Sequence, residues 1–203
     1  MTRAFAATLV GVLVLVCSLP AQTGGGRLRI SWIDVEGGAS TLYAQVPMNF
    51  LEKGKTAHYV TTGSWSEKAI GEAKVVAALF GAQVTAISTG TGEGKEKSYV
   101  RATRPGEVKV DPAAAYVHVT SNETIHGVEY GVDPARPFPD TGSVPLVADM
   151  SSDFLWRKVD VSRFGLVYAG AQKNIGPSGV VVGVASKQLG ERGRQDLPKV
   201  LQP

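Results

Sequence analysis

The sequence predicts an α/β fold with a mostly parallel central sheet flanked by helices, and three observations support this prediction. The chain has 203 residues, 43% of them hydrophobic and 19% charged, which suits one sizeable globular core or a domain with tails. From residue 27 onward, strand-like apolar runs alternate with helix-compatible stretches. Several of these runs are nearly continuous, as expected of strands that are buried on both faces of a parallel sheet.

The first half of the chain predicts strands and helices in alternation. The predicted elements are, in order, a strand at 28–35, a helix at 42–50, a strand at 58–62, a helix at 67–80 and a strand at 83–88. Ser66 is the expected N-cap of the second helix, because its hydroxyl directly precedes the helical pattern. Residues 89–106 are rich in glycine and charge, so they predict a surface loop with one short strand.

The second half contains apolar runs that each break into polar residues at the carboxyl end. The runs and their polar ends are 115–119 into 120–124, 144–148 into 149–152, and 166–169 into 170–174. Ligands of open α/β sheets bind beyond the carboxyl ends of the strands. We therefore expect the three polar ends to converge on one site. A further strand is predicted at 180–185, after which the chain becomes polar.

The polar ends contain the residue types that a pyridoxal-phosphate site requires. The amine of Lys173 can form a Schiff base with the cofactor aldehyde, and Asp149 can keep the ring nitrogen protonated. Thr124 can bond the phenolic oxygen, and Trp65 can stack on the ring. The glycine-rich turn at 37–41 offers backbone N–H groups to a phosphate. Each residue also has an ordinary alternative: a surface lysine, a turn or capping aspartate, a core tryptophan or a simple glycine turn.

Other site classes are disfavoured by composition. The net charge of +3 is small and its basic residues are spread along the chain, which argues against nucleic-acid binding. Cys17 is the single cysteine, so the chain has neither an internal disulfide nor a cysteine-rich zinc site. The three histidines, His58, His118 and His126, lack metal-ligand spacing, and no metal is predicted.

The first 26 residues form an apolar leader. Arg3 precedes a mostly apolar run at 4–19, and Pro20-Ala21-Gln22 and three glycines follow. This order is typical of a secretory signal, although the run is short for a membrane span. The alternatives are a buried strand or helix, or an atypical N-terminus joined to the domain.

Several ordered motifs resemble those of the phosphoserine aminotransferase family. The motifs lie at 37–40, 46–49, 62–69, 121–129, 148–152 and 168–177. The resemblance extends from about Gly37 to Pro198. It implies a class V pyridoxal-phosphate enzyme of the aspartate-aminotransferase-like fold, which is homodimeric when complete. The implied reaction converts 3-phosphohydroxypyruvate and L-glutamate to O-phospho-L-serine and 2-oxoglutarate in L-serine biosynthesis.

The resemblance also implies roles for individual residues. Lys173 would hold the cofactor and transfer protons, Asp149 would pair with the ring nitrogen, and Trp65 would stack on the ring. The expected contacts to the phenolic oxygen and to the cofactor phosphate come from Thr124, Ala39, Ser40 and Gln172.

Compared with that family, the chain is expected to be truncated at both ends. The interpretation divides it into the leader at 1–26, an incomplete cofactor-binding large domain at 27–186, and the start of a connection to a small domain at 187–203. Little turnover is expected from this exact chain. One alternative is a catalytically incompetent fragment or pseudoenzyme; another is an exported or membrane-anchored binding domain. The family resemblance favours the cytoplasm, with a plastid, a mitochondrion or secretion as alternatives.

Overall fold

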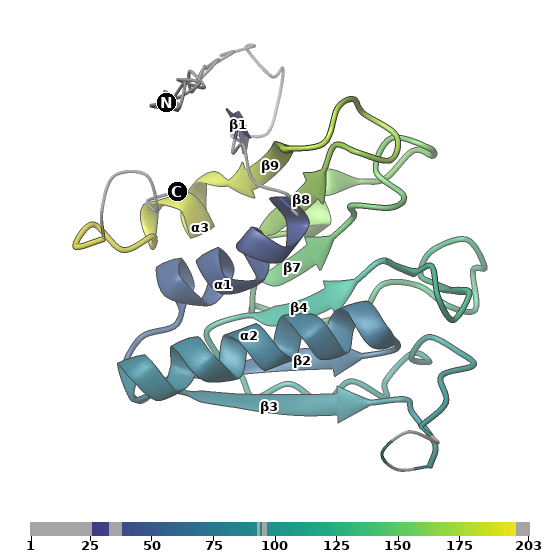
Figure 1. The fold of residues 1–203 in the computed structure, drawn as a ribbon. Helices are drawn as coiled ribbons and strands as arrows, with labels where there is room; N and C mark the ends of the chain where they lie inside the picture. Colours follow the sequence, from purple (N-terminus) through teal and green to yellow (C-terminus); the bar gives the residue numbers. More distant parts are fainter. Residues whose placement is uncertain (1–25, 33–37, 93, 95–96, 198–203) are drawn as a thin grey trace, which may run out of the picture.

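The computed structural model describes residues 26–32, 38–92, 94 and 97–197, with side chains from residue 41 onward (Figure 1). The elements are β1 (Gly26–Trp32), α1 (Gly38–Phe50), β2 (Thr56–Thr61), α2 (Ser64–Phe80), β3 (Gln83–Ser88), β4 (Val117–Thr120), β5 (Asn122–Glu123), β6 (Val128–Glu129), β7 (Leu146–Asp149), the 3-10 helix η2 (Val161–Arg163), β8 (Leu166–Gly170), β9 (Val180–Ser186) and α3 (Lys187–Glu191).

The described strands form a seven-stranded sheet in the order β1-β9-β8-β7-β4-β2-β3. The neighbours from β3 to β8 are all paired in parallel. β9 is antiparallel to β8, and β1 is antiparallel to β9. A small two-stranded antiparallel sheet, β5-β6, follows β4 in the chain. The predicted α/β fold with a mostly parallel sheet is therefore confirmed.

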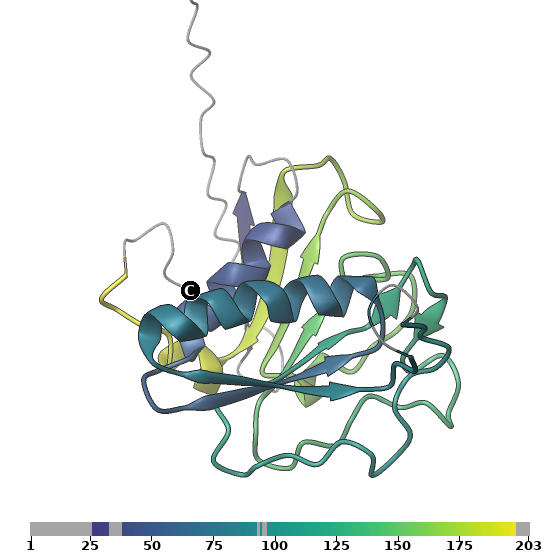
Figure 2. The same cartoon turned by 60° about the horizontal axis from the view of Figure 1, so that its bottom comes forward.

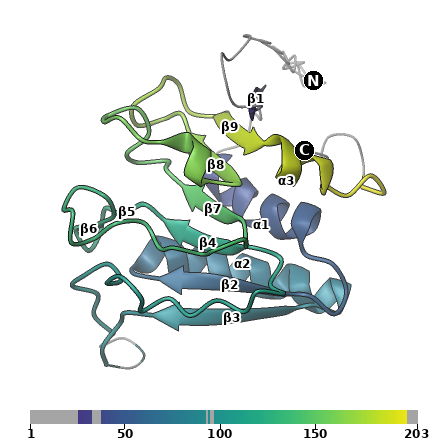
Figure 3. The same cartoon turned by 180° about the vertical axis from the view of Figure 1, so that it is seen from behind.

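Helices α1 and α2 cover one face of the sheet, and connecting segments cover the other (Figure 2, Figure 3). The helical side holds a core in which residues of α1 and α2, such as Tyr43 and Ile70, pack with strand residues such as Tyr59. On the opposite side, strand residues such as Val119 pack against loop residues such as Phe138. The sheet is thus covered on both sides.

The central strands match the sequence pattern that predicted them. Every residue of β4 and of β7 is buried, as near-continuous apolar runs require. β3 lies at the edge of the sheet, where its side chains are exposed or only partly buried. In Figure 1 the arrowheads of β2, β3 and β4 point to the same side, so their carboxyl ends share one edge of the sheet.

Helix α2 begins earlier than the sequence pattern predicted. Its buried positions, including Ala69, Ile70 and Ala73, recur at helical spacing and face the sheet. Gly63 is the N-cap, so the expectation that Ser66 caps the helix is wrong. The Ser66 hydroxyl instead reaches back from the first turn and accepts the N–H groups of Thr62 and Gly63, at 2.9 and 3.1 Å. At the other end Gly81 adopts φ 67°, a left-handed conformation that ends the helix.

The N-terminal strand also differs from its predicted range. It covers Gly26–Trp32 rather than 28–35, and it pairs with β9 at the sheet edge. Residues 33–37 lie outside the described part of the chain, as does the predicted leader except for Gly26. β9 ends at Ser186 and α3 follows it. The division into domains stays a prediction.

Candidate functional site

A pocket of about 340 Å³ lies at the carboxyl ends of β4, β7 and β8. Its residues come from α1, from the first two turns of α2, and from the ends of these strands and the segments that follow them. The lining residues are Tyr43, Trp65, Lys68, Thr120, Asn122, Thr124, Asp149, Ser151, Ser152, Gln172 and Lys173. The three polar strand ends therefore converge, as the sequence predicted. The volume is within the range of small-molecule sites.

Asp149 is the buried acidic residue of the pocket. It is the last residue of β7, and only 3% of it is exposed. Its Oδ1 atom accepts hydrogen bonds from the backbone N–H and the hydroxyl of Ser151, at 2.9 and 2.5 Å. Its Oδ2 atom accepts a hydrogen bond from the Tyr43 hydroxyl at 2.9 Å. Burial raises the pKa of Asp149 above its ordinary value of 3.8, while these hydrogen bonds favour the charged form and oppose the rise.

Trp65 and Thr124 meet at the side of the pocket. Trp65 is in the first turn of α2, and Thr124 follows β5. The indole N–H of Trp65 donates to the Thr124 hydroxyl at 3.0 Å. A flat aromatic face and a hydroxyl group are thus held together at the pocket, although their residues are 59 positions apart in the chain.

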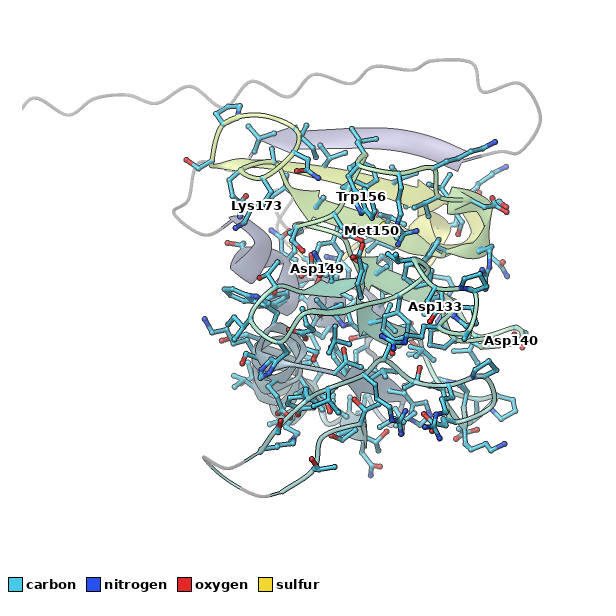
Figure 4. The ribbon with its side chains drawn as sticks, turned by 90° about the vertical axis from the view of Figure 1, so that its right-hand side faces the viewer. Asp133, Asp140, Asp149, Met150, Trp156 and Lys173 are labelled. Carbon is cyan, nitrogen blue, oxygen red and sulfur yellow. The ribbon has the colours of Figure 1, made fainter. Side chains whose placement is uncertain are left out.

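Two lysines line the pocket from different elements. Lys173 lies in the turn after β8, and both it and its neighbour Gln172 are exposed. In Figure 4, Lys173 is on the same side of the molecule as Asp149, and Asp140 lies toward the opposite side. Lys68 comes from α2, with its Nζ atom 4.7 Å from the centre of the Trp65 ring. The pocket therefore offers two amines and one buried carboxylate.

Thr120 provides a further indication that the pocket binds a polar ligand. It is the last residue of β4 and is 3% exposed. Within the described part of the chain, its buried hydroxyl oxygen has no hydrogen-bond partner. Buried polar atoms normally have a partner in the protein, in water or in a ligand. An unsatisfied hydroxyl beside a carboxylate, an indole and two amines fits a polar aromatic ligand such as pyridoxal phosphate.

Most of the predicted site residues meet in this pocket. Trp65, Thr124, Asp149, Gln172 and Lys173 all line it. Ala39 and Ser40 lie in the first turn of α1, and their side chains are outside the described set. Their proposed contact with a phosphate stays a prediction.

Thr120 belongs to the polar end at 120–124 that was expected at the site, but the sequence did not single it out, and it did not predict Tyr43 or Lys68. Lys68 is three positions after Trp65, a spacing that places both on one side of a helix. Tyr43 follows Ala39 by four positions and so shares a face of α1 with it. Helical spacing from a predicted site residue could therefore have indicated both.

The described residues contain neither a candidate membrane-spanning helix nor a candidate metal-binding cluster. None of the described helices combines the length and the apolar character needed to cross a bilayer. Nor do the described His, Cys, Asp and Glu side chains form a group of three or more that could hold a metal ion.

The fold and the pocket first define a general class, an α/β protein with a small-ligand site at the carboxyl ends of a mostly parallel sheet. The family follows from comparison with known proteins, because the family model described as aminotransferase class-V matches residues 29–197. The chain belongs to the class-V aminotransferase family.

Individual relatives within that family are phosphoserine aminotransferases. The chain is 48% identical over 167 residues to the phosphoserine aminotransferase of Lysinibacillus sphaericus (strain C3-41), covering 82% of this chain and 42% of that relative. The solved phosphoserine aminotransferase of Bacillus circulans subsp. alkalophilus aligns with a TM-score of 0.70 and 44% identity, covering 85% of this chain and 44% of that one. The PLP-bound enzyme of Trichomonas vaginalis gives a TM-score of 0.70 at 33% identity, with 86% and 48% covered. The chain thus spans less than half the length of these relatives.

Proposed function

We propose that this chain belongs to a pyridoxal-phosphate-dependent phosphoserine transaminase. The reaction transfers the amino group of L-glutamate to 3-phosphohydroxypyruvate, giving O-phospho-L-serine and 2-oxoglutarate in L-serine biosynthesis. One observation carries the proposal: Lys173, Asp149 and Trp65 line a single pocket in a chain that is 48% identical to a phosphoserine aminotransferase.

The proposed roles follow from the chemistry of the lining residues. When bound, pyridoxal phosphate supplies an electron sink for the substrate carbon that loses its proton. The Lys173 amine would hold the cofactor and would move a proton at the reacting carbon of the substrate. The Asp149 carboxylate would accept the N–H of the ring nitrogen, and its burial would strengthen that hydrogen bond. Trp65 would stack on the ring and exclude water from one of its faces.

The remaining predicted contacts hold the substituents of the ring. The Thr124 hydroxyl oxygen accepts the indole N–H of Trp65, and its O–H would donate to the phenolic oxygen of the cofactor. The backbone N–H groups of Ala39 and Ser40 lie in the first turn of α1 and would hold the phosphate there, because the helix dipole favours an anion. Gln172 lines the pocket from the segment after β8 and would contact the phosphate from there.

Absorption spectra of the purified chain test the cofactor proposal. Added pyridoxal phosphate is expected to give a visible band from covalently attached cofactor, and Lys173→Ala is expected to abolish it. Lys68→Ala is the matched control, because Lys68 is the other lysine lining the pocket and its variant should keep the band. A band that persists in Lys173→Ala, or that disappears only in Lys68→Ala, would show that the assignment is wrong.

A coupled assay with glutamate and 3-phosphohydroxypyruvate tests the substrates. Any turnover should require both compounds and should be lost in Lys173→Ala. Faster turnover of an unphosphorylated oxo acid would contradict the proposed substrate.

We further propose a cytoplasmic, homodimeric enzyme, because serine synthesis depends on partner enzymes inside the cell and the family resemblance implies a dimer.

A further inference from the structure

Glu123 is a buried carboxylate to which the proposed reaction gives no role. It is the second residue of β5, directly before Thr124, and it is 0% exposed. Its own carbonyl oxygen accepts the N–H groups of His126 and Gly127, at 3.0 and 2.9 Å, so the tight turn that follows holds its backbone. A buried carboxylate costs free energy unless strong hydrogen bonds compensate it. The hydrogen-bond partners of the Glu123 carboxylate therefore indicate its structural role.

Those partners lie at the start of α2. The Oε2 atom of Glu123 accepts the backbone N–H of Trp65 at 2.9 Å, and Oε1 accepts that of Ser66 at 2.7 Å. The first N–H groups of a helix have no partners within the helix, and the dipole there favours a negative charge. One carboxylate thus satisfies two of these groups and fixes the backbone of Trp65.

Gly63 allows this close approach. A Cβ atom built at Gly63 would lie 2.5 Å from the carboxyl carbon of Glu123, closer than real contacts allow. The N-cap of α2 therefore has to be glycine for the carboxylate to reach the N–H groups. The backbone at Gly63 and the carboxylate of Glu123 thus pack in direct contact, with no space for a side chain between them.

The residue next to Glu123 holds the other end of Trp65. The indole N–H donates to Thr124 at 3.0 Å. A third connection, between the Ser64 hydroxyl and His126 Nε2 at 3.0 Å, joins the same turn to the same helix end. Consecutive residues of one segment thus fix both the backbone and the ring of Trp65.

We propose that Glu123 is a positioning residue that sets the orientation of the Trp65 ring over the bound cofactor. The proposal rests on the proposed function, because the ring is the one that would stack on pyridoxal phosphate. In Glu123→Gln, one carboxylate oxygen becomes an amide NH₂, which cannot accept an N–H group. One of the two charge-assisted hydrogen bonds is lost and the other is weakened, so the first turn of α2 loosens.

A double-mutant cycle on the dissociation constant of pyridoxal phosphate tests this role. In the full chain, Glu123→Gln is expected to weaken binding about tenfold and to change the visible circular dichroism of the bound cofactor. In a Trp65→Ala background the same change should have little further effect, because no ring remains to be positioned. A purely structural role would instead weaken binding by the same factor in both backgrounds, which would overturn the proposal.

Two further variants keep the test interpretable. Glu129→Gln makes the same change on the paired strand β6 at a residue that does not line the pocket, and it should leave cofactor affinity and dichroism unchanged. If Glu123→Gln fails to fold, Gly63→Ala displaces the carboxylate without removing it and should weaken binding in the same Trp65-dependent way. Wild-type-like dichroism and affinity in folded Glu123→Gln would contradict the inference. Absence of a cofactor band in the wild type would instead contradict the proposed function.

Discussion

At the scale of single residues, Tyr43 and Asp149 form a pair that links a helix to the carboxylate of the site. Both are buried, at 4% and 3% exposure, and the phenol donates to Oδ2 at 2.9 Å. Oδ2 is free of the two Ser151 hydrogen bonds, which go to Oδ1. Tyr43 therefore moderates the basicity of the oxygen that is otherwise available to a ligand. In turn, burial raises the pKa of the Tyr43 phenol and the Asp149 charge raises it further, so Tyr43 stays a donor.

Tyr43→Phe should raise the pKa of Asp149. The hydroxyl stabilises the charged carboxylate, so its removal favours the protonated form, by an amount somewhat below one pKa unit for a hydrogen bond worth about 1 kcal/mol. The measurement is a pH titration of the carboxyl infrared bands of the apoprotein, with Asp149→Asn used to assign the band. An identical titration in wild type and Tyr43→Phe would contradict this role.

The sequence predicted pocket residues correctly by position where polar side chains end or follow an apolar run. Asp149 is the last residue of β7, Lys173 follows β8, and Thr124 lies a few residues after β4; parallel strands bring such carboxyl ends together. The chemical roles of these residues stay predictions. Tyr43 could not be assigned in the same way, because its partner is 106 positions away and depends on how α1 packs on the sheet. A tyrosine on a helix is by itself an ordinary core residue.

At the scale of elements, the segment between β3 and β4 is attached to the first turns of α2. Glu67 of α2 accepts hydrogen bonds from Lys97 and from the hydroxyl of Tyr99. Tyr99 is 4% exposed and packs edge-on against His126. The loop therefore joins the helix end and the turn after β5 into one unit beside the pocket.

Glu67→Ala should loosen this loop without unfolding the domain. A partly exposed ion pair and hydrogen bond contribute at most about 1 kcal/mol, so local opening should increase about fivefold. Hydrogen exchange at the amides of residues 98–102 measures the effect. Glu72→Ala is the control, because Glu72 is an exposed residue of the same helix. Unchanged exchange in Glu67→Ala would show that other contacts hold the loop.

The elements that the sequence did not predict depend on distant partners. Strands β5 and β6 have two residues each, too few to show periodicity. The early start of α2 depends on Glu123, which is 58 positions from Trp65. The antiparallel pairing of β1 with β9 joins the two ends of the described chain. Local patterns indicate strands and helices, whereas these features require contacts that form only in the folded domain.

At the scale of the whole molecule, buried titratable groups make stability depend on pH. His118 of β4 is 1% exposed, stacks on Tyr59 with ring centres 4.7 Å apart, and meets the Tyr168 hydroxyl at 2.8 Å through Nε2. Burial lowers the pKa of His118 from 6.5 to about 3. Burial also raises the pKa of Asp153 from 3.8 to about 6. The two groups have opposite effects on the free energy of unfolding in the same acidic pH range.

The signs follow from proton binding in the unfolded and folded states. Below pH 6.5 the unfolded chain protonates His118 while the folded protein does not, so stability falls as pH decreases toward about 3. Between pH 6 and 3.8 the folded protein protonates Asp153 while the unfolded chain does not, so stability rises as pH decreases. The free energy of unfolding should therefore vary less with pH in this range than either group alone would cause.

His118→Gln separates the two contributions. The variant should be less stable than wild type at pH 7, because it loses the stacking on Tyr59. Its deficit should then shrink by about 1.4 kcal/mol for each pH unit below 6.5, since glutamine takes up no proton. Urea unfolding from pH 7 to pH 4 measures this difference in the free energy of unfolding. In Asp153→Asn, by contrast, the free energy of unfolding should fall more steeply with decreasing pH than in wild type. A deficit in the free energy of unfolding that stays constant with pH would mean that His118 is protonated in the folded protein. The buried stack would then hold a positive charge without a negatively charged partner in its neighbours Tyr59 and Tyr168.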